Sequence, residues 1–410
     1  MGQTVVEKII SAHSGKKVER GEVVIVYVDG AMASDTTAPM AIQAFKTMGG
    51  QNVWDPSRCH LVIDHAAPAP NERIANLHIM MRQFAREQQM KIFEAGQGIC
   101  HQLMIENDLV KPGDIFIGAD SHTCSYGALG ALAVGVGSTD LAAVLLTGKT
   151  WLKVPSTIKI ALSGQLPAGT YSKDLILHVI GRLGIAGATY CAMEICGETI
   201  TGLSLSSRLV MANMMIEAGA KTGFIHPDGL ELPYPFTAVL ADTDAKYKQI
   251  IDIDVSDLQP MISQPHSPDK VVPVELELGR KIDYAFIGSC VNGRLEDLHI
   301  AAKILSNANV HPNTRLVIGP ASRQVFIQAI QDGTVETLLK AGATFIAPGC
   351  GPCVGTHNGV PGRGEVVIST ANRNFKGRMG NPEALVFLAS PATVAASARE
   401  GQVTHPLQYL

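Results

Sequence analysis

Residues 345–357 read Phe-Ile-Ala-Pro-Gly-Cys-Gly-Pro-Cys-Val-Gly-Thr-His, a short apolar strand that runs directly into the C-x-x-C pair Cys350 and Cys353. This spacing lets two thiolates point at one metal centre, and the glycines let the backbone pass close to it with free amide N–H groups. A third thiolate, Cys290, follows another apolar strand in a Gly-Ser-Cys turn. Three thiolates would leave one iron of an iron–sulfur cluster without a protein ligand, and an open iron can act as a Lewis acid toward an oxygen-rich substrate.

The same cysteines are compatible with two other kinds of site. A structural zinc site of the Cys₃His type would use Cys290, Cys350, Cys353 and His357. A redox-active C-x-x-C pair is the second alternative. The spacing of the cysteines does not choose between these sites, so the choice depends on the surrounding sequence.

Four apolar strands in the sequence are each followed at once by reactive side chains. They are Val62–His65, Phe116–His122, Phe286–Cys290 and Phe345–Cys350. In open α/β sheets, ligands bind outside the carboxyl ends of the parallel strands. The sequence therefore predicts one composite site between domains, formed where these strand ends meet.

Short strands alternate with helices along most of the chain, which predicts an α/β fold with mainly parallel sheets. The predicted helices lie at residues 5–12, 74–86, 99–107, 173–183, 207–220, 295–305 and 323–332. The predicted strands lie at residues 23–28, 60–63, 114–117, 157–162, 285–287, 315–318, 344–346 and 365–368. Pro155 precedes what looks like a second unit, and Pro265, Pro268 and Pro273 indicate a linker. We therefore expect three α/β domains, at residues 1–155, 156–271 and 272–410.

The composition is that of an ordered globular protein, because 46% of the 410 residues are hydrophobic and 17% are charged. The formal net charge of −4 provides no basic field for nucleic acid. Eight cysteines in so long a chain are not a disulfide framework, and no segment reads as a secretory signal or a membrane span. We expect a cytoplasmic protein that binds neither nucleic acid nor a membrane.

Two segments, Asp64-His65 and Asp120-Ser121-His122, each place a carboxylate close to an imidazole. A carboxylate can orient a histidine, fix its tautomer and raise its pKa toward the working pH. Adjacent residues of a strand face opposite sides of the sheet. A crossed pairing, in which each Asp holds a histidine from another segment, is therefore as compatible with the sequence as a local one.

Four more polar residues are candidates for the same site. His101 lies at the opening of a predicted helix, a position that suits neutral imidazoles and anions. Glu217 lies among apolar residues and would be costly if buried unpaired, so it either faces solvent, the simpler interpretation, or serves a site. Arg373 and Arg378 follow the strand at 365–368, and their forked guanidinium groups could grip a dicarboxylate, although a basic solvated turn is the commoner use of such a pair.

Taken together, these segments resemble the aconitase superfamily, in particular its two-subunit group of 3-isopropylmalate dehydratases and homoaconitases. The matching runs are Asp64-His65, Gly-Ile-Cys-His-Gln through His101, Gly-Ala-Asp-Ser-His-Thr through His122, Gly-Val-Gly-Ser-Thr-Asp through Asp140, the glycine-rich turn after Glu217, Gly-Ser-Cys-Val-Asn-Gly-Arg through Cys290, Pro-Gly-Cys-Gly-Pro-Cys through Cys353, and Asn-Arg-Asn-Phe-Lys-Gly-Arg through Arg378. Each run is modest alone, but the ordered set spans nearly the whole chain and is highly specific.

The resemblance implies three α/β/α domains of the aconitase type around one [4Fe–4S] cluster per subunit. It implies that the cluster is ligated by Cys290, Cys350 and Cys353. The implied acid–base residues are Asp64, His65, His101, Asp120, His122 and Glu217, and the implied substrate-binding residues are Ser34, Asp35, Ser121, Asn213, Arg373 and Arg378. The implied reaction is reversible dehydration and rehydration, which moves the hydroxyl group of a hydroxy di- or tricarboxylic acid between adjacent carbons.

Single-chain members of the superfamily continue into a mobile fourth domain, which carries a serine that removes the carbon-bound proton. This sequence stops at Leu410 without such a domain, so the resemblance implies a separate small subunit that supplies the base. Ser34, Ala66 and Ala67 depart from the usual pattern on the substrate side. The resemblance implies 3-isopropylmalate as the substrate, as in leucine biosynthesis, and these departures leave 2,3-dimethylmalate and homoaconitase substrates as alternatives. A non-catalytic iron or redox sensor is the alternative from a different class.

Overall fold

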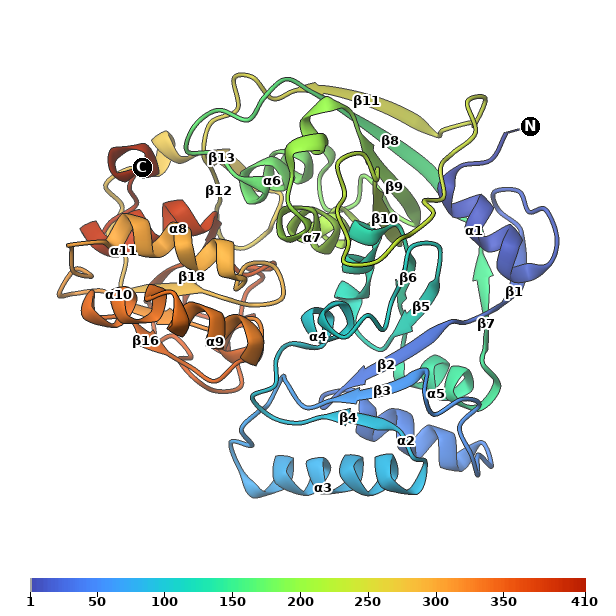
Figure 1. Ribbon diagram of the computed structural model, residues 1–410. Coiled ribbons are helices and arrows are strands. Elements are labelled where there is room, and N and C mark those ends of the chain that lie inside the picture. Colours follow the sequence, from blue (N-terminus) through green and yellow to red (C-terminus); the bar gives the residue numbers. More distant parts are fainter. Residues whose placement is uncertain (1) are drawn as a thin grey trace.

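The computed structural model describes residues 2–410, and three larger sheets follow one another along this part of the chain. In Figure 1 the first sheet, in blue and cyan, lies at the lower right, the second, in green, at the top, and the third, in orange and red, at the left. The predicted α/β fold is confirmed. The three sheets surround the segments in which the candidate site residues lie.

The first sheet is parallel throughout and has the strand order β4-β3-β2-β5-β6. Its strands are β2 (Gly30–Ser34), β3 (Cys59–Val62), β4 (Lys91–Phe93), β5 (Ile115–Gly118) and β6 (Leu132–Gly135), and its helices are α2 (Ala38–Thr47), α3 (Glu72–Glu87), α4 (Cys100–Glu106) and α5 (Ser138–Thr147). Alternate residues separate its two faces, as the period of two in a strand requires. Ala31, Leu61 and Ile117 belong to the core that also contains α2, α3 and α5, whereas Met32 and Phe116 belong to the core that contains α4.

The second sheet is also parallel, with the order β10-β9-β8-β11. It contains β8 (Ser156–Ser163), β9 (Cys191–Cys196), β10 (Thr222–Ile225) and β11 (Gln249–Asp254), together with helices α6 (Ser172–Leu183) and α7 (Leu205–Met214). Buried residues of both helices share one hydrophobic core with α4 and with cysteines of the third sheet's loops. The elements that carry the site residues therefore share one hydrophobic core.

The third sheet has the order β13-β12-β18-β17-β14-β15-β16 and is parallel except at β12 and β13. Its strands are β12 (Met261–Ser263), β13 (Val271–Pro273), β14 (Tyr284–Ile287), β15 (Arg315–Ile318), β16 (Thr344–Phe345), β17 (Val366–Ser369) and β18 (Leu385–Ala389). Its helices are α8 (Leu295–Leu305), α9 (Arg323–Gln331), α10 (Thr334–Lys340) and α11 (Pro391–Glu400). The cysteine loops follow β14 and β16, which are the neighbours of β15 on either side.

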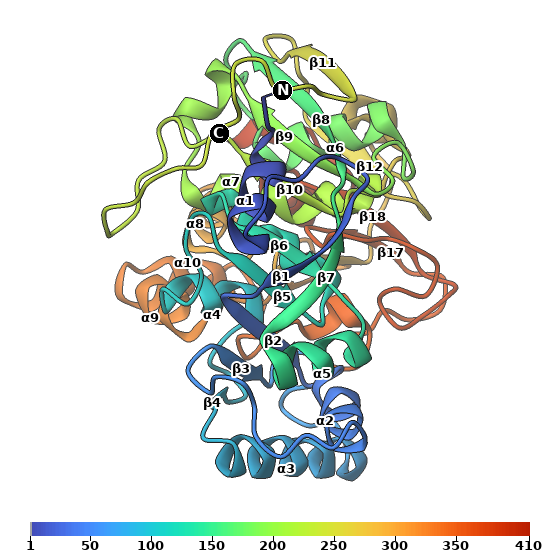
Figure 2. The same cartoon turned by 90° about the vertical axis from the view of Figure 1, so that its right-hand side faces the viewer.

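A separate antiparallel ribbon joins β1 (Val23–Tyr27) to β7 (Lys149–Lys153), close to the first helix α1 (Val5–Ser14). Figure 2 shows this ribbon at the front of the molecule. Helix α1 was predicted at residues 5–12, and Gly15 ends it in the left-handed conformation at φ 72°. Within residues 2–410, no helix is both long and apolar enough to cross a bilayer.

Two expectations about local structure are wrong. The helix predicted at residues 207–220 ends at Met214 and continues as a 3₁₀ turn, Met215–Ala218, which Gly219 closes at φ 86°. The expected proline linker is instead a hairpin, since Pro273 lies in β13 at the edge of the third sheet, where a missing backbone N–H is tolerated. The predicted domain boundaries remain a prediction, although β12 already belongs to the third sheet.

Candidate active site and metal centre

Three buried cysteines approach one another from the loops after β14 and β16. The Cys290 sulfur accepts hydrogen bonds from Asn213 Nδ2 at 3.2 Å and from Asn372 Nδ2 at 3.4 Å. Arg378 Nη2 lies 3.8 Å from the sulfur of Cys353. Donors aimed at cysteine sulfurs favour the thiolate form and are typical of iron–sulfur ligands.

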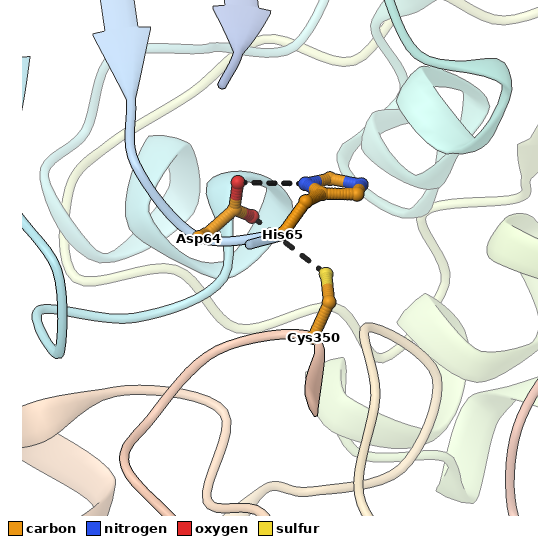
Figure 3. A group of neighbouring side chains, drawn as sticks. All are labelled: Asp64, His65 and Cys350. Carbon is orange, nitrogen blue, oxygen red and sulfur yellow. Dashed lines mark hydrogen bonds and ion pairs between the residues drawn. The ribbon is translucent and has the colours of Figure 1, made fainter. Parts of the chain in front are cut away.

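The spacing of the donor atoms distinguishes a cluster from a single ion. Among residues 2–410, only Asp64, His65 and Cys350 bring three metal-ligating atoms within 4.8 Å of one another (Figure 3). Cys290, Cys350 and Cys353 form no such group, so at least one pair of their sulfurs is further apart than the roughly 4 Å that tetrahedral zinc with Zn–S bonds of about 2.3 Å would require. His357 does not join them, because its Nε2 lies 2.9 Å from the carbonyl oxygen of Ala67. The donor set fits a polynuclear metal group, and the Cys₃His zinc site is not formed.

Burial determines the protonation of the thiols before a metal binds. Burial raises the pKa of Cys290 to about 12 and raises that of Cys350 well above its ordinary value. Without a metal both groups are therefore protonated at neutral pH. Metal binding must displace these protons, so uptake of the metal is favoured by higher pH.

Asp64 and His65, at the end of β3, form a local pair beside Cys350. His65 Nδ1 lies 2.8 Å from Asp64 Oδ1, and the other carboxylate oxygen accepts from the amide of Cys100, at the start of α4. The backbone joins the same two loops, because the Cys350 amide donates to the Asp64 carbonyl at 2.8 Å. The acid–base pair and the metal loop are thus fixed to each other.

Asp120, at the end of β5, contacts three histidines. Its oxygens lie 3.0 Å from His101 Nε2, 3.3 Å from His65 Nε2 and 3.5 Å from His122 Nδ1. Burial raises the pKa of Asp120, but the three imidazoles outweigh this effect and hold it well below its ordinary value. Asp120 is thus ionised, and it makes the crossed contacts that the sequence left open.

His65 lies between two carboxylates, which decides its charge. Both of its ring nitrogens face an acceptor, so both carry a proton when the bonds are made. Burial lowers the pKa of His65, but Asp64, the Cys350 sulfur and Asp120 together raise it well above its ordinary value. The site therefore holds a buried imidazolium with a transferable proton.

His122 and Glu217 form a second acid–base pair, from the 3₁₀ turns that follow β5 and α7. His122 Nε2 lies 2.9 Å from Glu217 Oε1, and Arg373 Nε donates to both Glu217 oxygens at 2.8 and 2.9 Å. Glu217 is only 5% exposed, so its solvent-facing interpretation is wrong. Burial raises the pKa of Glu217, but His122 and Arg373 outweigh this effect and leave it lowered.

The predicted substrate-binding residues occupy three different settings. Ser34 is fully buried, and its Oγ lies 2.9 Å from Thr36 Oγ1. Asn213 is also fully buried, and it faces the sulfur of Cys290. Ser121 is partly exposed beside His122, and Arg378 carries a buried Nε that has no hydrogen-bond partner in residues 2–410.

Asp35 binds the backbone of the loop that follows β3. Its carboxylate accepts from the backbone amides of Asp64, His65 and Ala66 at 2.8–3.2 Å and lies 3.1 Å from His78 Nε2. Burial raises the pKa of Asp35, but these partners lower it to about 2. Both oxygens of Asp35 are thus engaged in holding the loop after β3.

Three neighbours of the site were not assigned from the sequence. Asn372 contacts the sulfurs of Cys290 and Cys353, and Arg294 donates to the carbonyl of Cys290 at 3.0 Å. The Tyr126 hydroxyl lies 3.2 Å from His101 Nδ1. Asn372 and Arg294 stand inside the runs already quoted, so their positions were the available signal, whereas nothing marked Tyr126.

Comparison with known proteins agrees with this geometry. The model of the Aconitase family (aconitate hydratase) matches residues 7–401. The chain is 48% identical over the full length of both proteins to the 3-isopropylmalate dehydratase large subunit 1 of Methanopyrus kandleri. It is 49% identical to the probable methanogen homoaconitase large subunit of Methanosarcina mazei, over 92% of this chain and 98% of that protein.

A solved structure shares the fold. The aconitase X of Thermococcus kodakaraensis, in its holo form, aligns with a TM-score of 0.52 over 85% of this chain and 84% of that chain, at 15% identity. The extent of the sequence matches decides the assignment. The chain belongs to the aconitase family, is accordingly a hydro-lyase, and by that membership is implied to bind an iron–sulfur cluster.

Proposed function

We propose that this chain is the large, cluster-binding subunit of a cytoplasmic two-subunit dehydratase that isomerises 3-isopropylmalate. The observation that carries the proposal is the convergence of two carboxylate–imidazole systems on three buried cysteines. The full-length identity to large subunits of that enzyme supports the choice of reaction. A sensor would have no use for ionised acid–base pairs of this kind.

The cofactor is a [4Fe–4S] cluster on Cys290, Cys350 and Cys353. When bound, it supplies a Lewis-acidic iron without a protein ligand, which polarises the substrate's hydroxyl and carboxylate oxygens. The spread of the sulfurs and the donors from Asn213 and Asn372 support this assignment.

The imidazolium of His65 gives a proton to the departing hydroxyl, and Asp64 and Asp120 keep it charged beforehand and orient the ring. On rehydration the same group takes a proton back from water. His101 donates its Nε2–H to Asp120, so in its neutral form Nδ1 accepts from Tyr126. His101 therefore serves to align Asp120 with His65.

The carboxylates of the substrate are held by Arg373 and Arg378. The Nε of Arg373 is committed to Glu217, and among residues 2–410 its Nη groups make no hydrogen bond, which leaves them for a substrate carboxylate. The unpaired Nε of Arg378 supports a similar role, since a buried donor without an acceptor is costly. Ser121 and Asn213 complete the pocket, whereas Ser34 and Asp35 support its walls.

Homoaconitase activity is the second candidate, favoured by the 49% identity to the Methanosarcina mazei large subunit. The two activities differ in the substituent that the substrate carries. The small subunit supplies the base that removes the carbon-bound proton, and it completes the pocket around that substituent. Dimethylmalate, which carries a smaller substituent, is the third substrate to compare.

The experiment is anaerobic reconstitution of the chain with iron and sulfide, with and without its small subunit. We expect turnover of 3-isopropylmalate only when both subunits are present, and slower turnover of homoaconitate and 2,3-dimethylmalate. Dehydratase activity of the reconstituted chain alone would refute the two-subunit proposal. A colourless protein with stoichiometric zinc would refute the cluster.

A further inference from the structure

Lys173 is a fully buried lysine in the first turn of α6, outside the acid–base residues and the metal ligands. Its Nζ donates to the carbonyl oxygens of Thr370 and Ala371 at 2.8 and 2.7 Å. These carbonyls belong to the loop after β17, in the third sheet, and α6 lies between the second sheet and strands β12 and β13 of the third. Among residues 2–410, no carboxylate forms an ion pair with Lys173, so two neutral carbonyls are the only hydrogen-bond acceptors of its buried amino group.

The loop that Lys173 holds forms one wall of the metal centre. Thr370 Oγ1 donates to the carbonyl of Gly288 at 3.0 Å and accepts from the amide of Gly288 at 2.9 Å. Gly288 begins the turn that presents Cys290. Lys173 is therefore linked by two successive hydrogen bonds to the loop that carries a cysteine ligand.

The residues that follow in the loop face the reactive groups directly. Asn372 donates to the sulfur of Cys290 at 3.4 Å, and Arg373 donates to Glu217. The side chains of these two residues can be placed only if the backbone just before them is fixed. The two carbonyls bound by Lys173 are the backbone groups that immediately precede Asn372.

The charges around Lys173 are consistent with a role toward an anionic metal centre. Burial lowers the pKa of Lys173 to about 7, and negative charge on the sulfurs of Cys353 and Cys290 would be the strongest opposing influence. An isolated ammonium group is expensive to bury, and a nearby anion offsets this cost. Three cysteine thiolates around a cluster provide such an anion.

We propose that Lys173 is a positioning residue for the metal centre: its ammonium group fixes the loop of Thr370 and Ala371 against the cysteine turn and places one positive charge beside the loops that would hold the cluster. The inference rests on the proposed function, because it requires a cluster on Cys290, Cys350 and Cys353. A positive charge close to a cluster favours its reduced form, which carries one more electron. Lys173 thus raises the reduction potential of the cluster.

The test compares Lys173→Met, which removes both donors and charge, with Lys173→Gln, which keeps an N–H donor without charge. Lys248→Met is the matched control, since Lys248 is an exposed lysine near the second sheet whose Nζ contacts the sulfur of Cys191, outside the site. The full chain is reconstituted with iron and sulfide, and its reduction potential is measured by redox titration followed by electron paramagnetic resonance. Hydrogen exchange of residues 286–293 and 369–374 is measured on the metal-free protein.

For Lys173→Met we expect the equilibrium constant for reduction of the cluster to fall about tenfold, which lowers the one-electron reduction potential by about 59 mV. We also expect faster hydrogen exchange in residues 286–293 and 369–374. For Lys173→Gln we expect the same potential shift with a smaller change in exchange. Lys248→Met should match the wild type in both measurements.

A wild-type potential and wild-type exchange in Lys173→Met would overturn the inference. If Lys173→Met does not accumulate as folded protein, Lys173→Gln provides the test. A wild-type reduction potential in that variant would also overturn the inference. Absence of a cluster from the wild type itself would instead overturn the proposed function. The exchange measurement on metal-free protein would then still decide whether Lys173 positions the loop.

Discussion

Arg373 Nε donates to both carboxylate oxygens of Glu217, at 2.8 and 2.9 Å. Glu217 lies in the turn after α7, at the second sheet, and Arg373 lies in the loop after β17 of the third sheet. In the proposed function, the pair gives Arg373 two tasks, because the rest of its guanidinium holds a substrate carboxylate. It also explains how Glu217 can be buried and ionised beside His122.

Replacing Arg373 by lysine should distinguish the contribution of its positive charge from that of its forked guanidinium group. Lysine keeps the positive charge but lacks the planar fork, so it cannot reproduce the arrangement in which Nε binds Glu217 and the Nη groups face a second carboxylate. We expect kcat/KM to fall roughly 10–100-fold, the cost of one or more charge-assisted hydrogen bonds, in assays of the reconstituted two-subunit enzyme. Arg363→Lys is the control, since Arg363 pairs with Glu383 on the surface. Equal kinetics for Arg373→Lys and wild type would contradict the assignment.

Asp120→Asn should reduce turnover without loss of the cluster. An amide cannot accept hydrogen bonds from three imidazoles as a carboxylate does, and it removes the charge that keeps His65 protonated. We expect kcat to fall by roughly 10²–10⁴, the usual contribution of general acid–base catalysis. Iron and sulfide content should stay at the wild-type level, and the exposed Asp257→Asn should leave both quantities unchanged. Loss of iron in Asp120→Asn would show that Asp120 serves the metal instead.

Cys353→Ser should abolish cluster binding while leaving the fold intact, because a hydroxyl is a poor ligand for iron of this kind and the substitution changes little volume. Iron and acid-labile sulfide are measured after anaerobic reconstitution, and folding is followed by circular dichroism. Cys196→Ser provides the control, because Cys196 lies at the end of β9 with its sulfur 3.7 Å from the carbonyl of Ile160. A full complement of cluster in Cys353→Ser would exclude Cys353 as a ligand.

Asp35 should make the stability of the chain depend on pH in the acid range. Its pKa is lowered to about 2, so its contribution is fully present above its unfolded value of about 4 and is lost as the pH falls toward 2. The shift corresponds to about 2 kcal/mol. Urea unfolding at several pH values should therefore show Asp35→Asn less stable than wild type at pH 6, with the difference shrinking below pH 4. A difference that does not vary with pH would argue against ionised Asp35 as the support of the loop.

Much of the site could be predicted because its reactive side chains directly follow the ends of apolar strands. Cys290, Cys350, Asp64 and Asp120 each follow an apolar strand, and parallel sheets bring such ends to one edge. The pairing of carboxylates with histidines could not be predicted. Asp64 binds the adjacent His65, whereas Asp120 reaches histidines from three segments, and this depends on the distance between loops and not on any local pattern.

The burial of polar side chains is the second feature that could not be predicted from the sequence. Glu217 is enclosed because α7 ends at Met214 and the next turn carries the carboxylate toward His122. The acceptors of Lys173 lie 197 and 198 positions further along the chain, so no periodicity could reveal them. Both features arise from the packing of one sheet's helices against another sheet's loops.

The hydrogen bond from the Cys350 amide to the Asp64 carbonyl joins the C-x-x-C loop to the Asp64–His65 pair through the main chain itself. At position 350 only proline would remove the donor of this bond, and no side-chain substitution at position 64 removes its acceptor. The two halves of the chemistry are consequently inseparable: a proteolytic or engineered fragment that carries the C-x-x-C pair without β3 has lost the partner that frames it. Splitting the protein should yield neither a metal-loaded piece nor a proton-transferring piece, but two incomplete ones.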